Sequence, residues 1–172
     1  KTQYIPLLTA SSNGIVNDHY IYISTPNTNN VNFKIIENGG AIITGVVSNS
    51  NPYIYSVGSG NDTQLFTPKH IIGVISNKGY TIEAEDLVYV SVRTNAGNGA
   101  HAGGLVSKGN SALGKLFRLG GMLNPNVDAT LLNFASILST ENNTKVTISN
   151  FPVGTIFTDG TIFTAPIVVT LD

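Results

Sequence analysis

The residues best placed to touch a ligand belong to one stretch rich in glycine and asparagine, Thr94 to Gly104, which follows an apolar strand pattern. Its glycines suggest a phosphate-binding loop, but the spacing of a dinucleotide loop fails at Ala102 and no Gly-Lys-Ser/Thr sequence follows. No amphipathic helix follows either, so no helix dipole is available to a phosphate. We therefore expect a loop between strands that contacts a polar ligand, with a solvated connector as the alternative. The candidate ligand-binding residues are Arg93, Asn95, Asn98 and His101.

Two other groups of residues could bind a metal ion. Glu83, Glu85 and Asp86 form the densest acidic cluster, but on a strand the two glutamates share a face and Asp86 points the other way. Because no Asp-x-Asp-x-Asp-Gly loop is present, we favour a solvated strand end over a calcium site and leave calcium open. The histidines His19, His70 and His101 lack His-Glu-x-x-His spacing, so we expect no metal and place each at a strand edge or in a loop.

The sequence offers little support for catalysis. It contains neither Gly-x-Ser-x-Gly nor Ser-x-x-Lys, and it has no cysteine. Its 10 Asp and Glu residues are scattered along the chain, so no spacing in the sequence singles out a catalytic pair of carboxylates. We therefore expect a protein that is not an enzyme and that uses no cofactor.

The composition indicates β-structure and excludes two classes of partner. Charged residues make up 11%, against about 25% in soluble domains generally, and the chain has 18 glycines. Such a composition suits strands joined by tight turns better than long surface helices. With a net charge of −1 and no run of Lys or Arg, no nucleic-acid partner is expected. No apolar stretch reaches about 18 residues, so direct membrane insertion is not expected.

Short apolar or alternating segments follow one another along the whole chain, with turn signals between them. They predict an all-β fold, an antiparallel β-sandwich of many short strands, in a single domain over residues 1–172. Asn38-Gly39-Gly40 marks one hairpin, and Asp159-Gly160 marks another in which Phe157 would pair with Ile162 and Ile156 with Phe163. The predicted strands are 4–8, 19–25, 31–37, 41–48, 52–57, 70–76, 80–84, 87–94, 102–107, 114–119, 132–139, 145–150, 154–158, 161–164 and 166–171.

One sequence pattern occurs twice. Residues 21–33 and 136–148 align without a gap, with Ser-Thr, Asn and Val recurring in the same order. The pattern predicts a hairpin in 21–35 and again in 136–150, and therefore a sandwich with two related halves. Val31, Phe33, Val146 and Ile148 are expected to be buried. Apolar residues spaced as in a helix around 126–131 leave a helical turn there as an alternative.

Several motifs in order resemble those of the IgGFc-binding-type N-terminal domain. They are Lys-Gly-Tyr-Thr-Ile at 78–82, the strand at 87–92, Gly-Leu-Val at 104–106, Ala-Leu-Gly-Lys-Leu-Phe at 112–117 and the segment 139–148. Ser107-Lys108 stands where relatives often have proline, and the absence of cysteine is more typical of bacterial than of animal members. The resemblance implies a secreted, β-rich adhesive module of a large bacterial surface protein; it does not imply antibody binding.

The function expected from the sequence is therefore a non-catalytic binding or adhesion module at the cell surface or outside the cell. Its expected partners are an extracellular glycan or protein surface and neighbouring domains of the same chain. Since the chain begins with Lys1 and not Met, we expect it to be a piece of a longer protein. The alternatives are a carbohydrate-binding accessory domain, which would need solvent-facing tyrosines such as Tyr53 and Tyr55, a structural spacer, and an enzyme.

Overall fold

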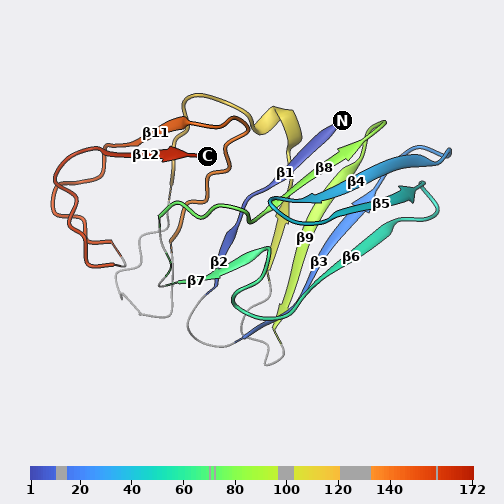
Figure 1. Ribbon diagram of the computed structural model, residues 1–172, viewed down its shortest axis with the longest axis horizontal. Coiled ribbons are helices and arrows are strands. Elements are labelled where there is room, and N and C mark those ends of the chain that lie inside the picture. Colours follow the sequence, from blue (N-terminus) through green and yellow to red (C-terminus); the bar gives the residue numbers. More distant parts are fainter. Residues whose placement is uncertain (11–14, 70, 72, 97–102, 121–132, 158) are drawn as a thin grey trace.

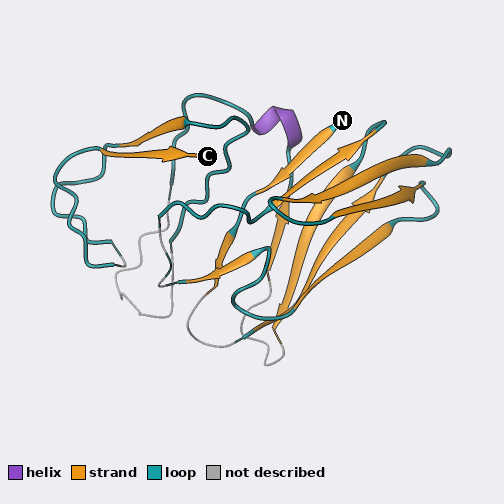
Figure 2. Ribbon diagram, in the orientation of Figure 1, coloured by secondary structure: helices purple, strands orange, loops and turns teal. Residues whose placement is uncertain are grey.

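The computed structural model describes residues 1–10, 15–69, 71, 73–96, 103–120, 133–157 and 159–172. Within these ranges the chain is built almost entirely of strands and loops, and its helical element is a short turn, η1 (Gly109–Ala112) (Figure 2). The expected all-β fold is confirmed.

Two four-stranded sheets form a sandwich (Figure 1). The first has the order β1 (Thr2–Ile5), β8 (Tyr80–Ala84), β4 (Val31–Glu37), β5 (Ile42–Val47). The second has the order β10 (Gly103–Val106), β9 (Tyr89–Ala96), β3 (Val16–Ser24), β6 (Tyr53–Gly58). Every pair of neighbours in both sheets is antiparallel.

The two sheets are joined by a pair of crossing connections. Strand β3 continues into β4 and β8 into β9, and each connection passes from one sheet to the other. The connections touch: Thr25 Oγ1 donates a hydrogen bond to Leu87 O at 2.6 Å, and Asn27 Nδ2 donates one to Asp86 Oδ2 at 2.9 Å. Because β3 pairs with β9 and β4 with β8, the crossings interlock the two sheets.

The prediction of a hairpin over residues 21–35 is therefore wrong. Its two strands exist, but they lie in different sheets and do not pair with each other. Alternating apolar residues specify which face of a strand is buried, and they do not specify which strand lies beside it. The polar turn between the strands forms hydrogen bonds to the other crossing connection, as the contact between Thr25 and Leu87 shows.

The second copy of the repeat takes a different structure. Residues 133–139, predicted as strand, are irregular, and β11 (Thr144–Ile148) pairs with β12 (Ile167–Leu171) in a separate two-stranded sheet. The turn before β11 is held locally, since Ser139 Oγ donates to Thr144 Oγ1 at 2.6 Å and Thr144 Oγ1 donates to Glu141 O at 2.6 Å. The alternative of a helical turn at 126–131 lies outside the described residues.

The core lies between the two sheets. Its buried apolar residues alternate along the strands, as the inward faces of a sandwich require. They include Ile21 and Ile23 of β3, Phe33 and Ile35 of β4, and Val90 and Val92 of β9. Val31 and Phe33 are buried as predicted, whereas Val146 and Ile148 are only partly buried.

The predicted hairpin at Asn38-Gly39-Gly40 is confirmed and joins β4 to β5, with Glu37 N bonded to Ala41 O at 2.9 Å. The second predicted hairpin has a different register, because Ile156 pairs with Ile162 and not with Phe163. Phe157 N bonds Thr161 O at 2.8 Å and Gly160 takes φ +83°, so the turn holds more residues than the two expected.

Other segments also depart from the prediction. The described residues of 70–76 and all of 114–119 are irregular. A short parallel pair, β2 (Leu8–Ala10) with β7 (Phe66–Pro68), was not anticipated. Figure 1 shows β11 and β12 to the left of the sandwich strands, apart from both four-stranded sheets.

Candidate functional site

The outer face of the second sheet carries exposed aromatic and apolar side chains. In β3 and β9 the inward positions are Ile21, Ile23, Val90 and Val92, so the alternate residues point outward. The outward set comes from four neighbouring strands, and we call it the tyrosine face. It comprises Tyr20, Tyr22, Ile54, Tyr89, Arg93 and Val106.

Strand register places these residues beside one another. Tyr22 lies opposite Ile54 on one side and Ser91 on the other, and Ser91 lies opposite Val106. Tyr20 lies opposite Arg93, and Ser24 lies opposite Tyr89. Directly opposed side chains have Cβ atoms about 4.5–5.5 Å apart. The set therefore forms one continuous patch over the sheet.

The side chains of the tyrosine face are accessible. Tyr89 is 57% exposed, Ile54 54% and Val106 55%. The rings of Tyr20 and Tyr22 lie 6.2 Å apart in an edge-to-face arrangement, and both are half-buried. The exposed aromatic and aliphatic side chains of this face therefore lie together in one patch and not singly.

Arg93 supplies the positive charge of the tyrosine face. Its side chain extends over Gly104, where an added Cβ would lie 3.0 Å from the guanidinium nitrogen Nη1. The absence of a side chain at Gly104 thus leaves room for the guanidinium to rest on the sheet. Lys78 and Asp62 form an ion pair, but no carboxylate in the described part of the chain forms one with Arg93. Asp18, in the β-bulge at the end of the face, is the one acidic residue of these four strands.

The sequence-predicted site is only partly described. Arg93 and Asn95 are both exposed and, two residues apart on β9, share the outer face with the tyrosines. Asn98 and His101 lie outside the described residues. The tyrosines proposed for sugar stacking were the wrong ones, because Tyr53 and Tyr55 point inward and pack against the core. The Tyr55 hydroxyl donates to Glu37 Oε1 at 3.0 Å, and burial together with that bond raises the pKa of Tyr55 to about 12.

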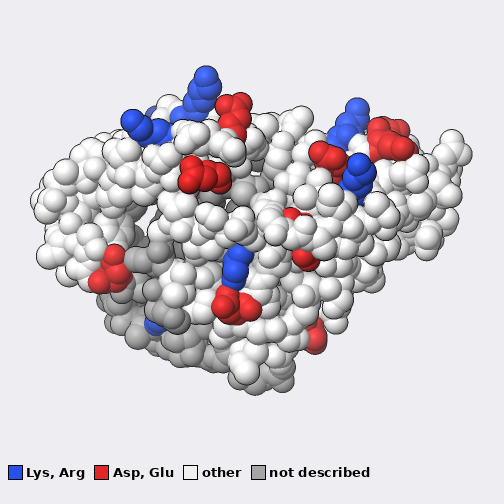
Figure 3. Space-filling model, in the orientation of Figure 1, with Lys and Arg blue, Asp and Glu red and all other residues white. Residues whose placement is uncertain are grey.

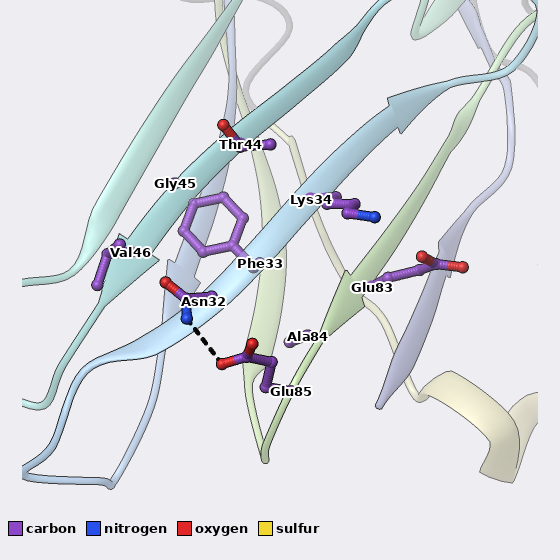
Figure 4. A pocket seen from close by; sticks show the side chains of 9 residues that line it. All are labelled: Asn32, Phe33, Lys34, Thr44, Gly45, Val46, Glu83, Ala84 and Glu85. Carbon is purple, nitrogen blue, oxygen red and sulfur yellow. Dashed lines mark hydrogen bonds between the residues drawn. The ribbon is translucent and has the colours of Figure 1, made fainter.

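The outer face of the first sheet has a different character. A shallow depression there is lined by polar and apolar residues of β4, β5 and β8 and by Glu85 just after β8, with Glu83 and Glu85 on the same face as predicted (Figure 4). Asn32 Nδ2 donates to Glu85 Oε2 at 2.8 Å, and Lys34 lies opposite Glu83 in the strand register. Phe33 reaches the depression from below because Gly45 beside it has no side chain. This surface mixes both charges, and it carries one half-buried tyrosine, Tyr4 of β1, in place of a group of tyrosines.

Asp86, the third residue of the acidic cluster with Glu83 and Glu85, stabilises the crossing connections. Its carboxylate accepts from the Leu87 backbone N–H at 2.7 Å and from Asn27 Nδ2 at 2.9 Å, and these bonds lower its pKa. No group of three or more His, Asp and Glu side chains suited to a metal ion occurs among the described residues.

The sequence predicts His19 at a strand edge or in a loop, but the residue is fully buried in the core. Its Nε2 donates to Val16 O at 2.9 Å, its Nδ1 lies 3.3 Å from Thr63 Oγ1, and its ring packs on Phe66. Burial lowers its pKa. Its role is therefore structural. His70 lies outside the described residues.

The charged residues in view are scattered over a mostly uncharged surface (Figure 3). None of the described helical segments has the length and apolar character needed to cross a membrane. Comparisons with protein-family models, with curated proteins and with solved structures found no match.

Proposed function

We propose that the protein is a non-catalytic binding or adhesion module of an extracellular or cell-surface protein, and that the tyrosine face is its ligand-binding surface. The observation that carries the proposal is the grouping of Tyr20, Tyr22 and Tyr89 with Ile54 and Val106 on one exposed sheet face. Tyrosine combines a large apolar ring with a hydroxyl, which suits it to contacts that are partly apolar and partly hydrogen-bonded.

The support for binding over catalysis is the shape and position of this surface. The tyrosine face lies on the regular part of a sheet whose other side packs into the core, so its side chains are held on a rigid support. The depression on the opposite sheet contains two glutamates, but one of them is engaged by Asn32. The location outside the cell is supported by the family resemblance of the motifs alone.

A carbohydrate-binding accessory domain is the second candidate, and the exposed tyrosines favour it. Aromatic rings on an open surface provide flat apolar area at little conformational cost. A structural spacer is the competing explanation, and it predicts that changes on the tyrosine face alter no interaction.

The test is binding of the whole chain, clustered on beads, to an array of glycans and extracellular matrix proteins. Clustering is needed because a flat surface without a deep pocket should bind weakly and depend on avidity. We expect Tyr22→Ala combined with Tyr89→Ala to abolish retention on the array. The matched control is Tyr4→Ala, which removes a tyrosine from the outer face of the other sheet and should leave retention unchanged.

The melting temperature of each variant separates loss of binding from loss of folding. Tyr89 is 57% exposed, so its replacement should have little effect on stability. Retention of the double variant at the level of the unchanged protein would reject the tyrosine face as the ligand surface and favour the spacer.

A further inference from the structure

The lone arginine of the tyrosine face indicates what kind of ligand the face accepts. Resting on the binding function proposed above, we propose that the tyrosine face binds a carboxylate-bearing saccharide, with the tyrosines stacking on sugar rings and Arg93 binding the carboxylate. Three features of the face support this ligand: its aromatic surface, the hydroxyl and amide groups around that surface, and an arginine with no carboxylate partner among the described residues.

The aromatic surface extends over more than one ring. Tyr20 and Tyr22 are successive outward residues of β3, with ring centroids 6.2 Å apart. Tyr89 lies on the neighbouring strand, opposite Ser24 and hence diagonal to Tyr22. Diagonal neighbours on antiparallel strands are about 7–8 Å apart, within reach of aromatic side chains. The apolar C–H faces of successive sugar units could therefore contact adjacent rings.

Small polar groups surround the rings. Ser24, Ser56 and Ser91 are outward residues of the same strands, and Asn95 continues the outward row of β9 beyond Arg93. Hydroxyl and amide groups both donate and accept hydrogen bonds, as sugar hydroxyls require. A purely apolar partner would leave these groups without hydrogen bonds, at a cost to binding.

The charge selects among saccharides. Arg93 lies directly opposite Tyr20, and its guanidinium is accommodated over Gly104. It has no carboxylate partner in the described part of the chain. A guanidinium presents paired N–H donors whose geometry matches a carboxylate, so an acidic sugar satisfies both its charge and its hydrogen bonds. A single arginine does not provide the many phosphate contacts of nucleic-acid binding.

The experiment compares pairs of saccharides that differ in charge. The probes are tetragalacturonate and sialyllactose, each paired with its own methyl ester and titrated into the full ¹⁵N-labelled chain. The two pairs distinguish a uronic acid from a sialic acid. We expect at least one acidic member to bind about tenfold more tightly than its neutral partner, a difference of about 1.4 kcal/mol. Raising the ionic strength from about 0.01 M to about 1 M should remove most of this preference, because charges are then screened within about 3 Å.

The variants assign the preference to named residues. Arg93→Gln should equalise the acidic and neutral members without weakening the neutral one, and Arg93→Lys should retain part of the preference because it keeps the charge and loses the paired donors. Tyr22→Ala should weaken both members several-fold. Lys34→Gln removes one cation from the outer face of the other sheet and is the matched control, with no change expected.

Equal binding of both members of each pair, or an acid preference that persists in Arg93→Gln, would overturn the proposal. So would the absence of any saccharide binding by the unchanged protein. In that last case, tyrosine-dependent retention on matrix proteins would leave the binding function standing with a protein ligand. If the unchanged protein neither binds a saccharide nor is retained on matrix proteins, the proposed binding function is overturned as well.

Discussion

At the scale of single residues, His19 shows how the core fixes one protonation state. Thr63 Oγ1 accepts the backbone N–H groups of Leu65 and Phe66 at 3.2 and 3.1 Å, so its own proton is free to be donated to His19 Nδ1. With Nε2 donating to Val16 O, the ring is satisfied only in its neutral form. A second proton on the ring would bind at Nδ1. It would remove the acceptor of the Thr63 hydroxyl and leave a positive charge in the core.

This arrangement predicts a specific dependence of stability on pH. Above the unfolded pKa of 6.5, His19 is neutral in both states and carries no penalty. As the pH falls below that value, the unfolded chain binds a proton and the folded chain resists it, since the folded pKa is lowered. The free energy of unfolding should therefore fall between about pH 7.5 and 5.5, with a slope of at most about 1.4 kcal/mol per pH unit from this group.

Urea unfolding at several pH values, on the unchanged protein and on His19→Gln, measures the effect. Replacing His19 should reduce stability at pH 7.5 and flatten the decline toward pH 5.5, while the other histidines are retained. Parallel declines in the two proteins would show that His19 is not the titrating group.

The alternation in the sequence could have identified this residue and the tyrosines. His19, Ile21 and Ile23 are spaced by two, as are Tyr20 and Tyr22 on the other face. The same holds for Val88, Val90 and Val92 against Tyr89, Ser91 and Arg93. The sequence does not reveal that these two strands, about 70 residues apart, are neighbours in one sheet. For that reason the sequence alone points to a site in a loop and not to one on the sheet.

At the scale of elements, the repeated segment separates sequence similarity from structural role. Val31 and Val146 occupy matching positions, but Val31 is 4% exposed and lies in the central core, whereas Val146 belongs to the separate β11–β12 pair and is partly buried. The environment of a strand depends on what its neighbours supply. Here β4 has β8, β5 and the facing sheet, and β11 has β12 as its only paired strand among the described residues.

The two valines should therefore differ in what their removal costs. Val31→Ala should lower the free energy of unfolding by about 2 kcal/mol or more through lost burial and an unfilled cavity. Val146→Ala should lower it by about 1 kcal/mol or less, because solvent already reaches that side chain. Urea denaturation of both variants under one set of conditions measures the difference, and equal losses would mean that the two segments contribute equally to the fold.

At the scale of the whole molecule, the strands of the sandwich were predicted better than its connections. The ranges for β4, β5, β6 and β8 agree with the structure to within about a residue at each end, since strong alternation and turn residues delimit them. The pairing of β4 with β5 was predictable from the turn between them. The other pairings, the sheet to which each strand belongs and the crossings were not predictable, because they depend on contacts between segments far apart in the chain. The predicted strand at 114–119 is absent for the same reason, because a segment with strand-like residues becomes a strand only where another strand pairs with it.

The location of the core leads to a prediction about the chain as a whole. All members of the central cluster come from residues 5–92, and Phe163 is the only buried apolar residue beyond them in the described part of the chain. Phe163 belongs to a small aromatic group with Phe151 and Phe157, whose rings lie 5.3 to 6.5 Å apart. The interlocked sheets and η1 are complete by residue 112.

A chain ending at residue 112 should therefore fold on its own. We expect it to unfold cooperatively, with a melting temperature lowered by no more than about 4–8 °C, the shift that corresponds to about 1 kcal/mol in a domain of this size. The hydrogen bond from Ser136 Oγ to Leu7 O is among the contacts it would lose. Deletion of residues 1–7 is the control, because it removes β1 with the buried Ile5 and should unfold the chain. A non-cooperative transition in the shorter chain, measured by circular dichroism, would mean that residues 113–172 complete the core and that the sandwich and its C-terminal segment form one cooperative unit.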